Sequence, residues 1–171
     1  TEIYTLSLHD ALPILNEILE EIIRLCDDKV PEIVLAGVNL GAWGFEYGDS
    51  FDTLLNAIAS QNPSSRIRLS SIEPQFLTTS VIDKIAAHPH VFCNHLHVPL
   101  QSGSNTVLQS MNRGYTNAAF LKLIDHARSK IAHLGLTTDI IVGYPTEGNR
   151  EFADTLALAR DAGFHRIHAF S

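Results

Sequence analysis

Residues able to do chemistry gather in the stretch 95–116, HLHVPLQSGSNTVLQSMNRGYT. A short run with alternating apolar residues ends at Pro99 and at a cluster of turn-forming residues, and a helical pattern begins at about Val107. This pattern predicts a strand that runs into a loop. In proteins that repeat a strand and a helix, polar groups on loops at the carboxyl ends of parallel strands usually form the binding site. The side chains here that suit a polar ligand are Gln101, Ser102, Ser104 and Arg113.

Two histidines on the predicted strand offer a second kind of chemistry. His95 and His97 are two residues apart, so they share one face and could bind a metal ion, as the HxH strand of metal-dependent barrel hydrolases does. Such a site needs further ligands from neighbouring strands, and Asp139 is the obvious carboxylate. Clustered histidines more often serve as hydrogen-bonded structural residues, and both interpretations stay open at this point.

Other loops that follow predicted strands also carry candidate groups. The segment 37–44, GVNLGAWG, has three glycines that let backbone amides approach a ligand closely. Pro74 biases Glu73 to an extended conformation, which places a carboxylate at the rim of the sheet. Glu147 follows a later strand in another glycine-containing turn. A surface carboxylate without a function is the alternative for either glutamate.

The elements that must position these groups alternate along the chain. Apolar residues recur at helical spacing from Leu15 to Cys26, and short apolar or alternating runs indicate strands. Strands separated by helices imply a parallel sheet with right-handed crossovers. Strands are predicted at 33–37, 66–71, 95–99, 136–142 and 165–170, with further helices at 51–60, 80–88, 106–111, 117–133 and 150–162.

Alternation within the strands distinguishes between two α/β architectures. A doubly wound sheet buries both faces, so its strands read as nearly continuous Val, Ile and Leu. Here alternate positions are polar, and Arg68, His97 and Asp139 fall on the same side. If helices cover the apolar face, the polar face lines a lumen. We therefore predict an arc of a TIM-like barrel whose lumen holds a polar ligand.

Composition and charge set outer limits on the function. The chain has 171 residues, is 45% hydrophobic and fits one soluble domain with a real core. The net charge of −7 has the wrong sign for a surface that grips RNA or DNA by itself, and no run approaches membrane-spanning length. Cys26 and Cys93 are far apart in unlike contexts, which argues against a disulfide framework, so a reducing cytoplasm is the expected compartment.

The first residues differ in pattern from the rest of the chain. Residues 1–14, TEIYTLSLHDALPI, show neither helical nor strand periodicity and lack the basic region of a signal peptide. The string YTLSLHDALPI resembles translated sequencing-adapter DNA. We expect 1–14 to be a non-native segment and 15–171 to be an incomplete barrel core. A disordered natural terminus is the alternative.

Six phrases carry a family resemblance that covers nearly everything from Leu15 onward. They are IVLAGVNLGAWG (33–44), RIRLSSIEP (66–74), HLHVPLQSGS (95–104), MNRGYT (111–116), TTDIIVGYPTEG (137–148) and FHRIHAFS (164–171). In this order they resemble the catalytic core of the radical S-adenosylmethionine methylthiotransferases, most closely the branch that thiomethylates N6-threonylcarbamoyladenosine beside the tRNA anticodon. The resemblance implies an α/β fold, a partial (β/α)6 TIM-like barrel in which this chain supplies parallel strands two to six and the first strand is missing.

The resemblance also implies cofactors and partners. In the family, a CxxxCxxC loop after the first strand holds a 4Fe-4S cluster, and the open iron position takes the amino and carboxylate groups of S-adenosylmethionine. This sequence has no CxxxCxxC, so the chain is expected to be inactive alone. The whole protein would bind tRNA mainly through domains that are missing here, and it would need an electron donor protein.

Individual roles come by analogy with the family, which implies a cofactor site of seven residues: Asn39, Glu73, Gln101, Ser102, Ser104, Arg113 and Asp139. The loop 101–104 would hold polar parts of S-adenosylmethionine, and Asn39 and Glu73 would lie near its methionine end. Asp139 is placed for a ribose hydroxyl, and Arg113 for a carboxylate or a tRNA phosphate.

Two other functions stay open on the sequence. One is a metal-dependent hydrolase barrel that uses His95, His97 and Asp139. The other is a non-catalytic α/β binding domain, which needs only the lumen. Stoichiometric zinc without iron would favour the hydrolase.

Overall fold

The computed structural model describes residues 3–7 and 14–171. The strands are β1 (Ile3–Ser7), β2 (Glu32–Ala36), β3 (Arg66–Leu69), β4 (His95–His97), β5 (Gly135–Ile141) and β6 (Arg166–Phe170). The α-helices are α1 (Leu15–Asp27), α2 (Phe51–Gln61), α3 (Thr79–Ala87), α4 (Asn105–Ser110), α5 (Asn117–Lys130) and α6 (Asn149–Ala162), and two 3-10 turns, η1 (Leu40–Ala42) and η2 (Phe45–Tyr47), come after β2. No helix in these two ranges is long and apolar enough to cross a membrane.

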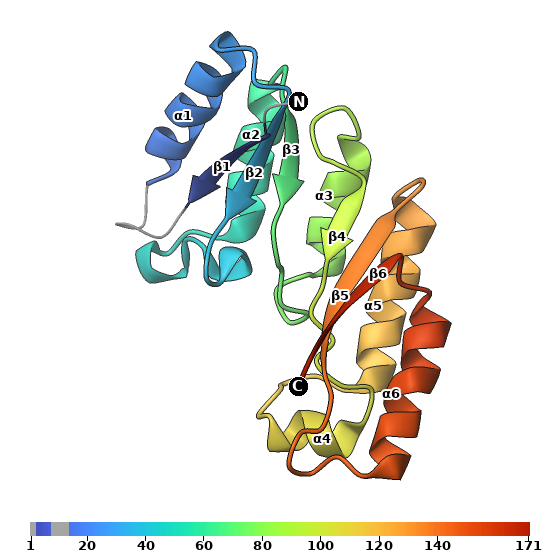
Figure 1. Cartoon of the computed structure of the whole chain (residues 1–171). Helices are drawn as coiled ribbons and strands as arrows, with labels where there is room; N and C mark the ends of the chain where they lie inside the picture. The colour runs from blue at the N-terminus through green and yellow to red at the C-terminus, as the bar shows by residue number, and fades with distance from the viewer. Residues whose placement is uncertain (1–2, 8–13) are drawn as a thin grey trace.

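The strands form an open arc of parallel strands in the order of the sequence. β1, β2 and β3 pair in one sheet, and β4, β5 and β6 pair in another. Single bridges join the two halves, from Ile67 to Phe92 and from Ser71 to His97. Figure 1 shows the halves diverging between β3 and β4, and the arc does not close into a barrel within the described residues. The predicted partial barrel is confirmed.

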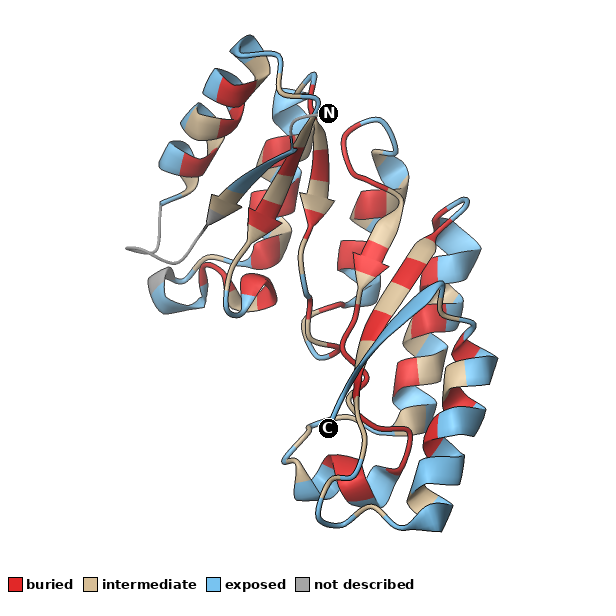
Figure 2. Cartoon of the chain, in the orientation of Figure 1, coloured by how far each residue is buried: buried red, intermediate tan, exposed pale blue. Residues whose placement is uncertain are grey.

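Burial alternates along the strands and separates the two faces of the arc. In β3, Ile67 and Leu69 are buried while Arg66 and Arg68 are half-buried, and β5 repeats this alternation over seven residues. Figure 2 shows the alternation as red and tan bands on the strands, with red bands also on the helix surfaces that meet the sheet. The polar positions therefore lie on the face away from the helices, as the alternation in the sequence predicts.

Helix ends reflect local capping chemistry. The helices α2, α3 and α5 each begin after a hydroxyl side chain that accepts a backbone N–H three residues later: Ser50, Thr78 and Thr116. Gly163 ends α6 in the left-handed conformation at φ 59°. β4 stops at His97, earlier than the sequence predicts, because Pro99 has no N–H to donate to a ladder. The helix-facing side chains merge into one apolar core that runs through both halves of the arc.

One expectation is corrected by the structure. The sequence predicts no strand before residue 15 and a missing first strand, but Ile3–Ser7 form β1 and pair in parallel with Glu32–Ala36. Ile, Tyr and Thr favour strands, yet the apolar residues of IYTLS neither alternate regularly nor form a continuous run, so the sequence carries no strand pattern there. The non-native origin of residues 1–14 stays a prediction, and 1–2 and 8–13 lie outside the described residues.

Candidate functional site

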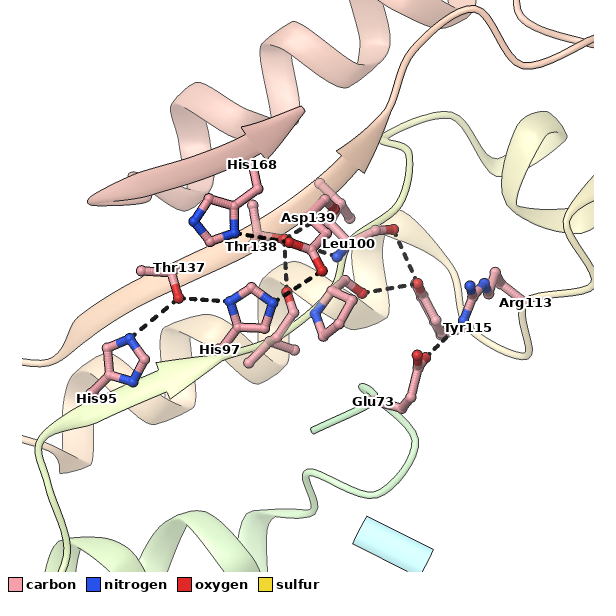
Figure 3. A network of polar contacts seen from close by, with 12 residues as sticks. Glu73, His95, His97, Leu100, Arg113, Tyr115, Thr137, Thr138, Asp139 and His168 are labelled. Carbon is pink, nitrogen blue, oxygen red and sulfur yellow. Dashed lines mark hydrogen bonds and ion pairs between the residues drawn. The ribbon is translucent and has the colours of Figure 1, made fainter. Parts of the chain in front are cut away.

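Asp139 is the centre of the polar face, where three strands meet. Its two carboxylate oxygens each contact a different imidazole: Oδ2 lies 3.1 Å from His97 Nε2, and Oδ1 lies 3.2 Å from His168 Nδ1. Strand pairing brings these groups together, because Asp139 pairs directly with His168 and His97 pairs with Thr137. The two imidazole rings stack at 5.7 Å between centroids (Figure 3). The carboxylate therefore has a donor on each side.

A hydrogen-bonded chain continues from this carboxylate along β4. His97 Nδ1 lies 2.8 Å from Thr137 Oγ1, and the same hydroxyl lies 3.3 Å from His95 Nε2 (Figure 3). One arrangement satisfies every neutral group: His95 donates to Thr137, Thr137 donates to His97, and His97 donates to Asp139. Burial lowers the pKa of His95, and the charge of Arg68 adds to the effect. Both effects favour the neutral form of His95, which is compatible with this arrangement.

Several buried polar atoms on or near this face have no hydrogen-bond partner among the described residues. They include His95 Nδ1, Ser70 Oγ and Arg66 Nε. Buried polar groups in proteins are nearly always paired, with protein, water or a ligand. These atoms thus leave hydrogen-bonding capacity on β3, β4 and the adjoining residues that the described side chains do not meet.

An ion pair between β2 and β3 forms the other wall of the polar face. Arg68 donates from Nε to Glu32 Oε1 at 2.6 Å and from a terminal nitrogen to Oε2 at 3.0 Å. These hydrogen bonds lower the pKa of Glu32. Cys93 Sγ lies 3.6 Å from the same carboxylate, and burial raises the pKa of this thiol. Cys93 is thus a packed neutral side chain of this wall and not a reactive thiolate.

The loop after β4 is divided between the two faces of the sheet. Gln101 has φ 64°, donates its N–H to the Asp139 carbonyl and accepts from the Ile141 N–H, so it stays beside Asp139 at the end of β5. Ser102 turns toward the helices: it is fully buried, and its hydroxyl lies 3.2 Å from Thr155 Oγ1 in α6. Ser104 is also buried, and its N–H donates to the Ser102 hydroxyl.

The remaining predicted residues lie at the rim. Arg113 donates to Glu73 at 2.9 Å, which joins the loops after β3 and α4. Tyr115 donates from its hydroxyl to the carbonyls of Pro99 and Leu100 and so ties the same segment to the end of β4 (Figure 3). A pocket of about 410 Å³ lies beside this segment, lined by Asn105, Gln109, Arg113, Gly114, Tyr115 and Thr116. Asn39 is exposed and starts the turn η1 after β2.

The structure therefore brings some of the predicted residues together and separates others. Gln101 lies next to Asp139, and Glu73 pairs with Arg113. Ser102 is buried against α6, on the helix side, and Ser104 is buried and bonded to Ser102. Sequence reasoning missed His168 as a site residue, although its polar position on the predicted last strand carried the signal.

The two histidines that lie near Asp139 are not the two that the sequence predicts. The histidine that joins His97 and Asp139 is His168, and the ligand atoms of these three residues lie within 4.8 Å of one another. His95 reaches His97 only through the Thr137 hydroxyl. The set of His95, His97 and Asp139 on which the hydrolase alternative depends is therefore not the set that converges.

Curated relatives match most of the chain. The tRNA-2-methylthio-N(6)-dimethylallyladenosine synthase of Aquifex aeolicus is 40% identical over 158 residues, which cover 91% of this chain and 36% of the relative. The synthase of the same name from Cutibacterium acnes is 40% identical, with 91% of this chain and 32% of the relative covered. The chain thus spans about a third of the length of these relatives.

Solved structures share the fold at low identity. The radical S-adenosylmethionine methyltransferase TsrM from Kitasatospora setae superposes with a TM-score of 0.74 at 12% identity, over 91% of this chain and 30% of that one. Coproporphyrinogen III oxidase (HemN) from Escherichia coli gives 0.67 at 15% identity, over 98% and 43%. The family model of the radical SAM superfamily matches residues 9–159. With a match over most of its length and the same fold, this chain belongs to the radical SAM superfamily.

Proposed function

We propose that this chain is the core segment of a tRNA methylthiotransferase that binds S-adenosylmethionine on the polar face of its sheet. The observation that carries the proposal is the Asp139 carboxylate with its two imidazole partners, on the inner face of a radical SAM fold. The names of the relatives, which are 40% identical over most of this chain, support the methylthio transfer and tRNA as the substrate. An electron donor protein and a cytoplasmic location are part of the same proposal.

In this proposal the polar face binds the nucleoside part of the cofactor. Asp139 accepts hydrogen bonds from the ribose hydroxyls, and Gln101, held beside it by backbone hydrogen bonds, contacts neighbouring polar atoms. Asn39 and Glu73 lie toward the methionine end. Ser102 and Ser104 act through the shape of the loop, because Ser102 fixes it against α6 and Ser104 bonds to Ser102.

Arg113 has a defined partner before any ligand arrives. Its ion pair with Glu73 offsets its charge, and Arg113 also lines the pocket beside α4. A carboxylate of the cofactor or a phosphate of tRNA would therefore bind Arg113 in competition or in a shared network with Glu73. We assign no catalytic residue.

The 4Fe-4S cluster of the family does not fit the residues of this chain. A cluster is held by several cysteine thiolates close together, and this sequence has Cys26 and Cys93 alone. Cys26 lies at 3.2 Å from the Ser65 hydroxyl behind the sheet, while Cys93 faces Glu32. We therefore expect the 171 residues by themselves to bind no cluster and to be inactive, and we derive no reaction step through it.

The proposal also specifies which modified adenosine of the tRNA is the substrate. The phrases GVNLGAWG and LSSIEP favour the branch that acts on N6-threonylcarbamoyladenosine. The curated relatives from Aquifex aeolicus and Cutibacterium acnes carry the name of the dimethylallyladenosine branch instead. We propose threonylcarbamoyladenosine as the substrate, and the two RNAs distinguish the branches directly.

A chimaera tests the function. Residues 15–171 replace the aligned segment of the Aquifex aeolicus relative, which supplies the rest of the protein. We expect it to add a methylthio group, detected by nucleoside mass spectrometry, to tRNA that carries threonylcarbamoyladenosine and far less to tRNA that carries dimethylallyladenosine. Product on the second RNA alone would move this segment to the other branch, whereas no product on either, from a chimaera that is folded and holds iron, would contradict the proposal.

A variant of the same chimaera tests the site. We expect Asp139→Asn to weaken S-adenosylmethionine binding at least about tenfold, because a charge-assisted hydrogen bond to the ribose is lost. Asp125→Asn, which removes an exposed carboxylate on α5, is the matched control and should leave binding unchanged. Equal affinities for the two variants in equilibrium dialysis would remove Asp139 from the site.

A further inference from the structure

We propose that Thr138 is a positioning residue: its hydroxyl holds a β-bulge in the segment after β4, and this bulge places Gln101 beside Asp139. The inference deepens the proposed function and rests on it, because Gln101 is one of the residues proposed to contact the cofactor. Thr138 is fully buried on the helix side of β5. It can therefore affect a ligand on the polar face only through the residues that it holds.

The pairing of β4 with β5 contains one extra residue on the β4 side. The last regular pair is His97 with Thr137, and the next bridge joins Gln101 to Ile140. Three residues of the segment after β4 thus lie opposite two residues of β5. This mismatch is a β-bulge, a feature that re-aims side chains and is common next to active sites. In an unbroken register Leu100 would pair with Ile140, so the extra residue puts Gln101 there instead.

Thr138 supplies the hydrogen bonds that the ladder loses at the bulge. Its hydroxyl donates to the Val98 carbonyl at 2.7 Å and accepts the Leu100 N–H at 2.9 Å (Figure 3). Pro99 lies between these two residues and has no N–H to donate. Val98 and Leu100 are fully buried, so removal of the hydroxyl would take a partner from a buried acceptor and from a buried donor. The shape of the bulge therefore depends on one side chain of β5.

Tyr115 closes the same bulge from the rim. Its hydroxyl donates to the carbonyls of Pro99 and Leu100, at 3.2 and 3.0 Å. Burial raises the pKa of Tyr115, so the hydroxyl keeps the proton that it donates. Gln101 follows directly in the left-handed conformation at φ 64°, with its N–H 2.9 Å from the Asp139 carbonyl. A residue other than glycine keeps such a backbone only where its surroundings fix it, and the bulge held from both sides provides those surroundings.

Amide hydrogen exchange of the full 171-residue chain tests the bulge without any cofactor. We expect Thr138→Val, which removes the hydroxyl, to speed exchange at Leu100 and Gln101 at least about tenfold relative to the amides of α3. Thr138→Ser keeps the hydroxyl and should exchange within about twofold of the wild-type chain. Ile58→Val is the control, because it thins the buried core at α2 and should not single out these two amides. Wild-type exchange at Leu100 and Gln101 in Thr138→Val would overturn the proposal.

Cofactor binding by the chimaera tests whether the bulge acts on the site. Thr138→Val should weaken S-adenosylmethionine binding at least about tenfold in equilibrium dialysis, because a contacting group is displaced. Thr138→Ser and Ile58→Val should bind within about twofold of the unsubstituted chimaera. In a chimaera that already carries Gln101→Ala, Thr138→Val should cost far less affinity, since the group that it positions is gone. A residue that only stabilises the fold would cost the same factor on both backgrounds.

The unsubstituted chimaera separates this inference from the proposed function. If it binds no S-adenosylmethionine, the proposed function fails, and the role of Thr138 fails with it. If it binds the cofactor and Thr138→Val binds equally well, the role of Thr138 alone fails. The same holds if Thr138→Val loses one and the same factor with and without Gln101→Ala.

Discussion

The ion pair of Glu32 and Arg68 gives the polar face a pH dependence. Hydrogen bonds from Arg68 lower the pKa of Glu32 from its ordinary value of 4.5. The unfolded state therefore takes up the proton first as the pH falls, so the contribution of Glu32 is fully present above about pH 4.5 and is lost as the pH drops through the folded pKa. We expect Glu32→Gln to lower the free energy of unfolding by about 1–2 kcal/mol at pH 7 and by less at about pH 3.

Urea unfolding at the two pH values measures this difference. Glu20→Gln is the control, since it removes an exposed carboxylate on α1, and it should change the unfolding free energy little at either pH. Equal destabilisation by Glu32→Gln at neutral and at acid pH would show that the pair contributes through packing and not through charge.

At the level of single residues, the sequence predicts which side chains are polar but not where a loop turns them. Asp139 could be placed on the inner face because its strand alternates over seven residues. Ser102 comes after Gln101, whose left-handed backbone reverses the chain and sends the next hydroxyl under α6. His168 could not be joined to Asp139 from the sequence, because that contact depends on the register of β5 and β6.

Among the elements, the contact of the loop after β4 with α6 depends on a single glycine. A Cβ atom on Gly103 would lie 2.5 Å from the Cα of Thr155 and 2.8 Å from the carbonyl of Asp154. The Gly103 N–H also donates to Thr155 Oγ1 at 3.0 Å. Since the obstacle is backbone, it cannot rotate away. The position of Gln101 beside Asp139 therefore depends on close packing two residues further on.

We expect Gly103→Ala to lower the free energy of unfolding by about 1–3 kcal/mol and to weaken S-adenosylmethionine binding in the chimaera, because overpacking displaces the loop from α6. Gly114→Ala is the matched control, since no atom lies within 4 Å of a Cβ built there. Thermal unfolding and equilibrium dialysis measure the two effects. A Gly103→Ala chimaera with normal stability and normal affinity would show that the loop adapts without affecting the site.

Among the strands, β1 is the one that the sequence does not predict. The five later strands are predicted by short apolar or alternating runs between helices, and all appear in the structure with shifted ends. β1 has five residues and is held by its register with β2, from Ile3 opposite Glu32 to Ser7 opposite Ala36. Pairing with the edge of β2 orders a short segment whose own sequence shows neither regular alternation nor a continuous apolar run.

In the whole molecule, the boundary between β3 and β4 has the least backbone pairing in the sheet, but the apolar core is continuous across it. Only single bridges cross it within the described ranges, yet buried side chains from both halves belong to one apolar cluster. The polar groups of the inner face lie on both sides of this line, with Glu32 and Arg68 on one and His97 and Asp139 on the other. Packing in the core therefore keeps the two halves of the polar face together, because the backbone pairing between them is sparse.

The outer edge of β6 is the surface of this 171-residue segment at which we expect association. All five residues of this strand are exposed, with Phe170 at 55%. Among the described strands β6 pairs with β5 alone, and a free strand edge is a template for a further strand. We expect concentration-dependent self-association in sedimentation velocity, and Phe170→Glu should weaken it about tenfold by removing apolar contact and adding charge repulsion. Phe45→Glu makes the same change at a side chain that is 82% exposed in η2, away from this edge, and should leave association unchanged. A chain that stays monomeric at every concentration, or equal effects of the two substitutions, would exclude β6 as the contact.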